Sequence, residues 1–396
     1  MLLEILLALV VVCSVVPAVL FVVNLGRYKL PRFGNSEDVR VTVLIPARDE
    51  EQNIGACLRS VLASREVDLQ VLVLDDDSAD RTMQIVLDVA KGDGRVGLLR
   101  SGVLPRGWNG KQHACWQLAQ MTNAPLLLFL DADVRLDPWA IARCVATLRK
   151  KELALLTGFP RQITVGFLEW LLLPLIHFVL LAYLPMGRMR KSNSAAYAAG
   201  CGQFMLVERE AYFGCGGHAA IRQTRHDGLR LPKLFREHGY STDLVDLTTL
   251  AEVRMYHTAG AVWSGLTKNA TEGIGSPARI VPFTLLLLLG QVVPLIAAVM
   301  CVLLMISVTV VGATYDDPLQ IAAFFLLIGL SLVCSFVPRL IAVKRFQQPL
   351  KSAWLHPLGV ALLLVVQWWA LLRQVVGRPV GWRTRTYSSG TGEEVG

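Results

Sequence analysis

The stretch that decides the fold is Leu126-Leu127-Leu128-Phe129-Leu130-Asp131-Ala132-Asp133, where an aliphatic run stops abruptly at two carboxylates. Five consecutive apolar residues predict a parallel strand that is buried on both faces. In open α/β sheets the carboxyl ends of such strands form the ligand-binding edge, so we expect Asp131 and Asp133 to lie there. Two carboxylates with one spacer can share a hard divalent cation, and that cation can hold a diphosphate. The same pattern also occurs in turns and helix caps, which leaves a structural role open.

Two earlier predicted strands end in the same way. Residues 41–46 run into Asp49-Glu50-Glu51, and residues 69–74 run into Asp75-Asp76-Asp77. Because parallel strands present their carboxyl ends at one edge of a sheet, we expect the three acidic ends to converge on one crevice. Chance capping explains one such cluster easily but three poorly. The repetition therefore favours a shared site.

Apolar residues at helical spacing follow each acidic strand end. They lie within residues 54–62, 83–90 and 141–148. We expect Asp137 to be the N-cap of the third helix, with Pro138 in its first turn. Three successive strand–helix units predict an α/β fold with a mostly parallel, Rossmann-like sheet.

The composition indicates a membrane protein. The 396-residue chain is 53% hydrophobic, and its mean hydropathy is +0.47. Residues 2–23 are apolar, contain Glu4 as their only charged residue, and are followed by Arg27 and Lys29. Because a basic start and a small-residue cleavage site are not evident, we expect residues 1–26 to be an uncleaved transmembrane anchor with its C-terminal flank in the cytoplasm.

Further apolar stretches close the chain, at about residues 281–312, 319–338 and 354–372. We expect Gln291 and Pro294 to divide the first of them. The positive-inside rule places the acidic connection 313–318 outside the cell and the basic connection 339–353 inside. Three crossings would then leave the tail outside, whereas its arginines favour the inside. The orientation of residues 377–396 therefore stays open.

Residues 165–185 form one more apolar segment in the middle of the chain. Glu169, Pro174 and His177 interrupt it, which favours a helix at the membrane interface over a crossing. A buried core helix is the alternative. In either case we expect residues 36–278 to be one cytosolic domain, followed by a C-terminal membrane region at 279–376.

The charge and the cysteine content of the chain limit the kinds of ligand and partner that it could bind. The formal net charge is +8 at pH 7, and much of the excess flanks the apolar segments. This pattern suits an anionic lipid surface, and the basic stripe with aromatic residues that nucleic-acid binding would need is missing from the sequence. The eight cysteines lack the paired spacing of metal sites, so we expect reduced packing residues.

The second half of the soluble region has polar positions with two possible roles each. Gly200-Cys201-Gly202 would let the backbone approach a ligand closely, or would suit a tight turn. Asp227 precedes a helical pattern at residues 229–235, so it is a helix cap or a site residue. Lys268 could bind phosphate or flank the membrane.

Taken in order, these motifs resemble those of the family 2 glycosyltransferases. The resemblance covers nearly the whole soluble region and rests on residues 46–51, 75–80, 131–133 and 226–227. A closer likeness is to the membrane-bound bacterial glycosyltransferases of the carotenoid (diaponeurosporenoate) and hopanoid-associated kind. It rests on Trp108-Asn109-Gly110-Lys111, Val253-Arg254-Met255-Tyr256 and Thr267-Lys268-Asn269.

The resemblance implies a GT-A fold and an inverting transfer from a nucleotide-diphosphate sugar, with a UDP-sugar as the first choice. The acceptor would be a membrane lipid or isoprenoid at the cytosolic face of the cell inner membrane. Asp131 and Asp133 would hold Mg²⁺ or Mn²⁺ against the diphosphate, and Asp227 would be the general base. Asp49 and Asp76, together with Asp75, would contact the nucleotide. Glu51 would support the nucleotide-binding loop, and Lys111 would be an additional cation near the diphosphate.

The chain also departs from the family pattern. Asp49 stands where Asn is common, and His226 stands where Glu usually precedes the catalytic Asp. The Gln-x-x-Arg-Trp motif of processive synthases is missing after Asp227, which favours a single transfer. Leu266 replaces an aromatic residue of the closer relatives, so the acceptor cannot be copied from them. His226 keeps a second hypothesis open, a catalytically impaired membrane protein that binds nucleotide-sugars as a scaffold.

Overall fold

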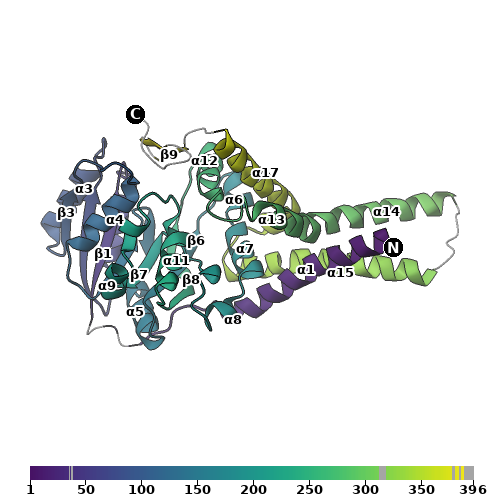
Figure 1. The fold of residues 1–396 in the computed structure, drawn as a ribbon, viewed down its shortest axis with the longest axis horizontal. Coiled ribbons are helices and arrows are strands. Elements are labelled where there is room, and N and C mark those ends of the chain that lie inside the picture. The colour runs from purple at the N-terminus through teal and green to yellow at the C-terminus, as the bar shows by residue number, and fades with distance from the viewer. Residues whose placement is uncertain (35, 37–38, 312–317, 377–379, 383–384, 388–396) are drawn as a thin grey trace. The chain divides into compact units, whose positions relative to one another are not determined.

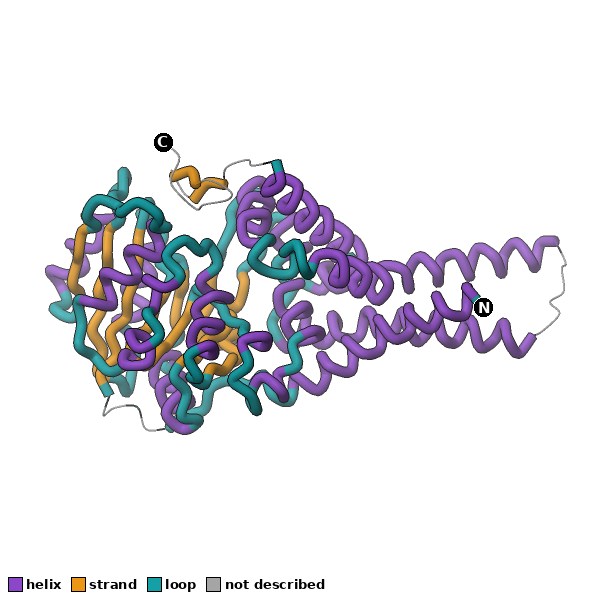
Figure 2. The backbone as a smooth tube through the Cα atoms, in the orientation of Figure 1, coloured by secondary structure: helices purple, strands orange, loops and turns teal. Residues whose placement is uncertain are grey.

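The computed structural model describes residues 1–34, 36, 39–311, 318–376, 380–382 and 385–387 (Figure 1). The chain divides into two compact units, each assembled from separated segments. The helical unit comprises residues 1–27, 164–185 and 256–371, and the sheet unit comprises residues 28–163, 186–255 and 372–396. Figure 2 shows that the large sheet lies in one unit and that the other is built from helices.

The sheet unit is built on one eight-stranded sheet in the order β3-β2-β1-β4-β7-β6-β8-β5. The strands are β1 (Arg40–Ala47), β2 (Asp68–Asp75), β3 (Val96–Arg100), β4 (Leu126–Leu130), β5 (Val134–Leu136), β6 (Leu155–Gln162), β7 (Phe204–Glu208) and β8 (Thr242–Val253). Strand β1 pairs in parallel with β2 and β4, with Ala47 opposite Asp75 and Leu44 opposite Phe129. The three acidic strand ends therefore share one edge, as predicted. Antiparallel β7 then makes the sheet as a whole mixed.

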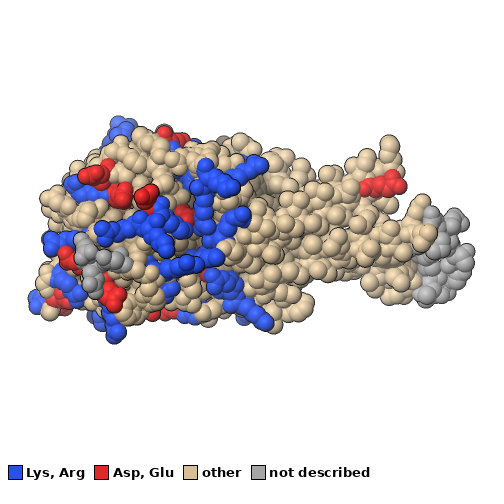
Figure 3. All heavy atoms as spheres, turned by 90° about the horizontal axis from the view of Figure 1, so that it is seen from below, with Lys and Arg blue, Asp and Glu red and all other residues tan. Residues whose placement is uncertain are grey.

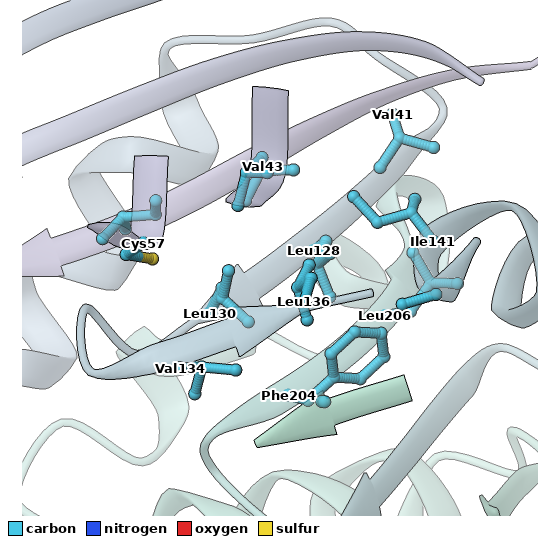
Figure 4. Packing of buried hydrophobic residues seen from close by; sticks show 14 of the residues in the cluster. Val41, Val43, Cys57, Leu128, Leu130, Val134, Leu136, Ile141, Phe204 and Leu206 are labelled. Atoms are coloured by element: carbon cyan, nitrogen blue, oxygen red, sulfur yellow. The ribbon is translucent and has the colours of Figure 1, made fainter. Parts of the chain in front are cut away.

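Helices cover both faces of this sheet. They are α2 (Ile54–Leu62), α3 (Thr82–Gly92), α4 (Gly110–Gln120), α5 (Ala140–Lys150), α8 (Met186–Met189), α9 (Arg209–Gly214), α10 (Gly217–Ala220) and α11 (Asp227–Glu237), with the 3-10 turn Ala195–Tyr197. Val41 and Val43 pack with Cys57 of α2 and Ile141 of α5 on one face (Figure 4). Leu44 points to the other face, in a cluster with residues of α4, α9 and α11. This alternation explains why β1 is apolar almost throughout.

The third predicted helix begins later than expected. Strand β5 pairs with β8 up to Leu136, and the Asp137 amide donates to the Leu250 carbonyl at 2.8 Å. The Asp137 carboxylate accepts from the Trp139 amide at 2.9 Å, so it closes a turn at the end of the strand. Helix α5 then starts at Ala140 with Trp139 as its N-cap. The prediction of Asp137 as the N-cap was wrong because Asp137 closes the turn that follows β5, two residues before the N-cap.

The helical unit is dominated by long apolar helices. Its elements are α1 (Leu2–Leu25), α6 (Phe167–Leu172), α7 (Leu175–Tyr183), α12 (Ala259–Ala270), α13 (Ile280–Leu287), the π-helical turn Leu288–Val292, α14 (Val293–Val311), α15 (Pro318–Arg345), α16 (Leu350–Trp354) and α17 (His356–Val375). Among the described residues, the stretches long and apolar enough to cross a membrane are Leu2–Leu25, Ile280–Ser307, Leu319–Arg345 and His356–Val375. Figure 3 shows that the visible surface of the long helices is almost devoid of Lys and Arg, which gather elsewhere on this face.

The expected interruption near Gln291 is a π-helical turn that is packed against α1. Ser14 of α1 donates to the Gly290 carbonyl at 3.1 Å. A Cβ atom at position 290 would lie 2.1 Å from the Cys13 carbonyl oxygen, so only glycine allows this approach. The interruption thus serves packing between two apolar helices.

Pro174 separates the middle apolar segment into α6 and α7, where the sequence predicted one helix. Both helices are largely buried inside the helical unit, and Glu169 and His177 are buried with them. Phe178 of α7 contacts Phe21 of α1, with ring centroids 6.4 Å apart. This burial matches the core-helix alternative, and a location at the membrane interface stays a prediction.

Helix α15 is longer than predicted and includes Arg339, which we expected in a connection. The Arg339 guanidinium is fully buried and donates to the Pro174 carbonyl, the Gln348 side chain and the Ser352 hydroxyl at 2.9–3.0 Å. The basic connection therefore begins only after Arg345. Residues 312–317 of the predicted outer connection and most of the tail 377–396 lie outside the described residues. Within the tail, β9 (Val380–Trp382) pairs with β10 (Arg385–Tyr387).

Candidate active site

The loops after β1 and β2 are tied together by their acidic residues. Asp49 has a positive φ of 53° and Asp77 one of 59°, which marks two sharp turns. The Asp49 amide donates to the Ser78 hydroxyl at 3.0 Å, and the Asp49 carboxylate accepts from the Ala79 amide at 2.9 Å. One oxygen of Asp49 is therefore already engaged in joining the loops.

Arg48 is a residue of this region that sequence reasoning left without a role. Its guanidinium donates to the Asp76 carbonyl at 2.7 Å and lies 3.7 Å from the Asp76 carboxylate and 3.9 Å from that of Asp49. It thus lies between two acids to which the resemblance assigns the nucleotide. The available signal was a single base within an otherwise acidic motif. Asp75 beside them is buried, and its Oδ1 has no hydrogen-bond partner within the described ranges.

Glu51 supports these loops from the outside. Its carboxylate accepts from the Arg81 amide at 3.3 Å and forms an ion pair with the Arg81 side chain. The Glu51 amide donates to Asp80 at 3.0 Å. Burial alone would raise the pKa of Asp80, but hydrogen bonds from Thr82 and from the Glu51 amide outweigh it and lower this pKa. Glu51 therefore lies where a loop-supporting role was expected.

The centre of the site is an ion-pair cluster of three residues from three elements. The Lys111 ammonium lies 2.7 Å from Asp131 Oδ1 and 3.0 Å from Asp227 Oδ2. Lys111 is in the first turn of α4, Asp131 follows β4, and Asp227 opens α11. The side chains are 19%, 27% and 9% exposed for Lys111, Asp131 and Asp227. The structure thus brings together a candidate metal ligand, the candidate base and a cation that connects them.

Local sequence explains how Lys111 is held. Asn109 is the N-cap of α4, and its side chain accepts from the Lys111 amide at 3.1 Å. The Asn109 amide in turn donates to the Arg222 carbonyl at 2.8 Å, which anchors the loop before the helix. The backbone of Lys111 is therefore fixed, and its four-carbon side chain carries the charge into the site.

Burial and charge work against each other in this cluster. Burial disfavours the charged form of Lys111, but the carboxylates of Asp131 and Asp227 outweigh it and raise its pKa well above the ordinary value. Burial likewise opposes an ionised Asp227, but Lys111 prevails and lowers the pKa of Asp227 to about 2. Both groups are therefore charged at neutral pH.

Asp133 experiences the opposite environment. Burial, followed by the neighbouring charge of Asp131, raises the pKa of Asp133 to about 7. Its Oδ1 is buried and lacks a hydrogen-bond partner in the part of the chain that the structure describes. A cation would relieve both conditions, so Asp131 and Asp133 fit Mg²⁺ or Mn²⁺. The described residues contain no group of three or more His, Cys, Asp or Glu that could hold a metal ion, so further ligands would be substrate oxygens and water.

The glycines at 200–202 serve the candidate base. A Cβ atom on Gly202 would lie 2.1 Å from Asp227 Oδ1, and one on Gly228 would lie 2.6 Å from the Gly202 amide nitrogen. The Asp131 amide also donates to the Gln203 carbonyl at 3.2 Å. The loop at 200–203 therefore contacts both Asp131 and Asp227, and its glycines allow close approach to a protein side chain.

His218 is a second residue that sequence reasoning missed. It is fully buried, shares a hydrogen bond of 2.8 Å with the Tyr212 hydroxyl, and packs edge-on against Phe129 of β4. Burial lowers the pKa of His218 to about 3, which keeps it neutral. The surrounding glycines predict an exposed loop, whereas Gly217–Ala220 is the short helix α10, so the sequence did not indicate a buried histidine.

Part of the sheet unit is similar to known proteins. Residues 42–213 match the model of the family described as Glycosyl transferase family 2. The chain is 27% identical over 269 residues to the 4,4'-diaponeurosporenoate glycosyltransferases of Staphylococcus aureus strains USA300 and NCTC 8325. The alignment covers 64% of this chain and 66% of those relatives, just under two thirds of their length.

The fold is similar to that of a mannosyltransferase, PcManGT from Pyrobaculum calidifontis, solved in complex with GDP-Man and Mn²⁺. The TM-score is 0.53 and the identity 13%, with 93% of this chain and 99% of that chain covered. At this identity the likeness shows the fold alone. The predicted GT-A type of α/β fold is confirmed.

Proposed function

We propose that this chain is a glycosyltransferase, on the strength of the match of residues 42–213 to the family 2 model and of the named relatives. The chain transfers one sugar, with inversion and without processivity, from a nucleotide-diphosphate sugar to a lipid or isoprenoid acceptor. The reaction takes place at the cytosolic face of the cell inner membrane. The single observation that carries this proposal is the cluster of Asp131, Lys111 and Asp227 at the acidic edge of the sheet.

The nucleotide would bind at the loops after β1 and β2. Asp75 and Asp76 are buried there, and Asp75 Oδ1 is an acceptor without a hydrogen-bond partner among the described residues. A nucleobase N–H or a ribose hydroxyl would satisfy this oxygen. Arg48 and Glu51 keep the two loops together, and Asp49 Oδ2, which lies 3.9 Å from the Arg48 guanidinium, would accept from the ligand. A UDP-sugar is the first donor to test.

Asp131 and Asp133 would hold the divalent cation, which supplies Lewis-acid stabilisation of the departing nucleotide diphosphate when it is bound. Lys111 adds a second positive charge on the same side of the site. Both charges would oppose the negative charge that develops as the bond between sugar and phosphate breaks.

Asp227 is the proposed base. The acceptor hydroxyl would lose its proton to Asp227 Oδ2 as its oxygen attacks the anomeric carbon opposite the leaving group. One carboxylate suffices for this direct displacement, which inverts the configuration at that carbon. The glycines at 202 and 228 allow the close packing that positions Asp227, and Lys111 keeps Asp227 ionised before the donor binds.

The membrane setting is supported by the long apolar helices among the described residues and by the S. aureus relatives, whose name gives 4,4'-diaponeurosporenoate as the acceptor. A lipid acceptor would explain why a soluble sheet domain is covalently joined to so much apolar helix. The alternative is a scaffold that binds the donor without transferring sugar. It is favoured by His226 and by the ion pair that occupies Asp227 in this structure.

Transfer from radiolabelled donor to extracted bacterial lipids tests the proposal. The full chain in detergent, supplied with Mn²⁺ and either UDP-glucose or GDP-mannose, should label a lipid. D131A and D227N should abolish labelling, whereas D88N, an exposed acid on α3, should retain it. Donor binding measured by calorimetry with no transfer or hydrolysis from either donor would instead support the scaffold.

A further inference from the structure

Lys111 occupies a position that matters for cation binding. Its ammonium contacts Asp131, one of the two acids that would hold a divalent cation, and it also contacts Asp227. Asp133, the other proposed ligand, has a buried oxygen without a hydrogen-bond partner in the described ranges. An ammonium therefore contacts one proposed ligand directly, whereas Oδ1 of the other has no hydrogen-bond partner among the described residues.

An ammonium and a divalent cation that contact Asp131 at the same time would repel each other. Mg²⁺ binds carboxylate oxygens at about 2.0–2.1 Å, so a cation on Asp131 would lie close to a nitrogen that is 2.7 Å from Oδ1. Two like charges at such a separation repel strongly, and more so where burial excludes water. All three side chains of the cluster are less than one third exposed. Either Lys111 moves or the cation binds weakly.

The Lys111 side chain can change position while the backbone of α4 stays in place. Its backbone is held by the Asn109 cap, but its ammonium is at the end of a flexible four-carbon chain. A donor diphosphate beside Asp131 would offer this ammonium several anionic oxygens in place of one carboxylate. The diphosphate would then neutralise Lys111 while the cation neutralises Asp131 and Asp133.

We propose that Lys111 is the counter-ion of Asp131 while no donor is bound, and that its ammonium moves to the diphosphate when the donor binds. As a consequence, cation and donor bind cooperatively, and the donor-free enzyme has low affinity for metal. This inference rests on the proposed function, because it presumes that the edge binds a nucleotide diphosphate with a divalent cation. It adds a competition that the family resemblance does not imply.

Mn²⁺ binding provides a readout that is independent of turnover. The free Mn²⁺ signal in electron paramagnetic resonance is titrated with the full chain in detergent, without nucleotide. K111M should bind Mn²⁺ at least about tenfold more tightly than wild type, because the competing charge is gone. K111R keeps the charge and should stay near wild type. K111Q is the second neutral variant, since its amide can still donate to a carboxylate if K111M does not fold.

Nucleotide supplies the second arm of the experiment. UDP, and GDP in parallel, should tighten Mn²⁺ binding of wild type by a larger factor than that of K111M or K111Q. Coupling is reciprocal, so Mn²⁺ should strengthen UDP binding of wild type by the same factor. D133N should weaken Mn²⁺ binding in every background, which locates the ion at the proposed ligands.

The outcomes separate this inference from the proposed function. If Mn²⁺ binds wild type and the neutral variants with equal affinity, Lys111 does not compete and the inference is overturned alone. If Mn²⁺ binds neither wild type nor any variant, with or without UDP and GDP, the metal-dependent part of the proposed function fails together with it.

Discussion

Two cations, one in each unit, have different partners. Lys111 in the sheet unit contacts two ionised carboxylates, Asp131 and Asp227. Arg339 in the helical unit is fully buried, and its three hydrogen bonds within the described ranges go to neutral oxygens of Pro174, Gln348 and Ser352. One cation therefore belongs to a network of opposite charges, and the other satisfies backbone and side-chain acceptors.

This difference separates a charge that ligands can use from one that maintains architecture. The carboxylates around Lys111 lie at strand ends, where a substrate can exchange places with the ammonium. The Pro174 carbonyl lies at the break between α6 and α7, and the guanidinium donates to it from the buried interior of the helical unit. We expect variants of Lys111 and its acids to affect chemistry, and variants of Arg339 to affect stability.

The largest expected effect is that of D227N on transfer to an alcohol. Removing a general base should lower kcat by about 10²–10⁴-fold, while donor affinity changes little. The measurement is kcat with a lipid alcohol acceptor, with D88N as the control. A carboxylic acid acceptor is already ionised at pH 7, so the loss should be much smaller for it. An equally large loss with both acceptors would show that Asp227 acts on something other than the acceptor proton.

K111M should have the second-largest effect on transfer. Loss of a positive charge at the departing diphosphate should lower kcat by about 10²-fold, and K111R should recover part of it. R339M, assayed in parallel on folded protein, should keep kcat near the wild-type value. The comparison of the two cations fails if both variants lose transfer to the same extent.

R339M should instead lower stability. It removes the guanidinium's buried hydrogen bonds to the Pro174 carbonyl and the Ser352 hydroxyl, at a cost of about 1–3 kcal/mol in the free energy of unfolding. K344M, which removes an exposed charge near the end of the same helix, should change stability by less than about 0.5 kcal/mol. Thermal unfolding in detergent measures both. A stable R339M would mean that the helix break does not need the guanidinium.

The smallest effect is on acid stability. The pKa of Asp227 is lowered from 3.8 to about 2 in the folded chain, so the carboxylate contributes stability that is fully present above pH 4. This contribution, on the order of 2 kcal/mol, is lost as the pH falls through about 2. The difference in unfolding free energy between wild type and D227N should therefore shrink from pH 4 to pH 2. A difference that stays constant would mean that Lys111 does not favour the ionised form of Asp227.

Much of the sheet could be predicted because its signals are local. The runs at 41–46, 69–74 and 126–130 are apolar on both faces and end at acids, so their burial and their shared edge follow from the pattern alone. Strand β8 was missed because its sequence contains Asp243 and Asp246, which a strand-core pattern excludes. Lys151 and Arg190 pair with Asp243 from distant segments, and this pairing is visible only in three dimensions.

The α/β class, the acidic edge and the apolar helices follow from the linear sequence, because hydrophobic periodicity and local composition are set by neighbouring residues. The bridge from Lys111 to Asp131 and Asp227, the space that Gly202 leaves for Asp227, and the burial of Arg339 in a helix became visible in three dimensions. The physical reason is distance along the chain. Ion pairs and close approaches between remote segments depend on how strands and helices pack, and a linear pattern contains no record of that packing.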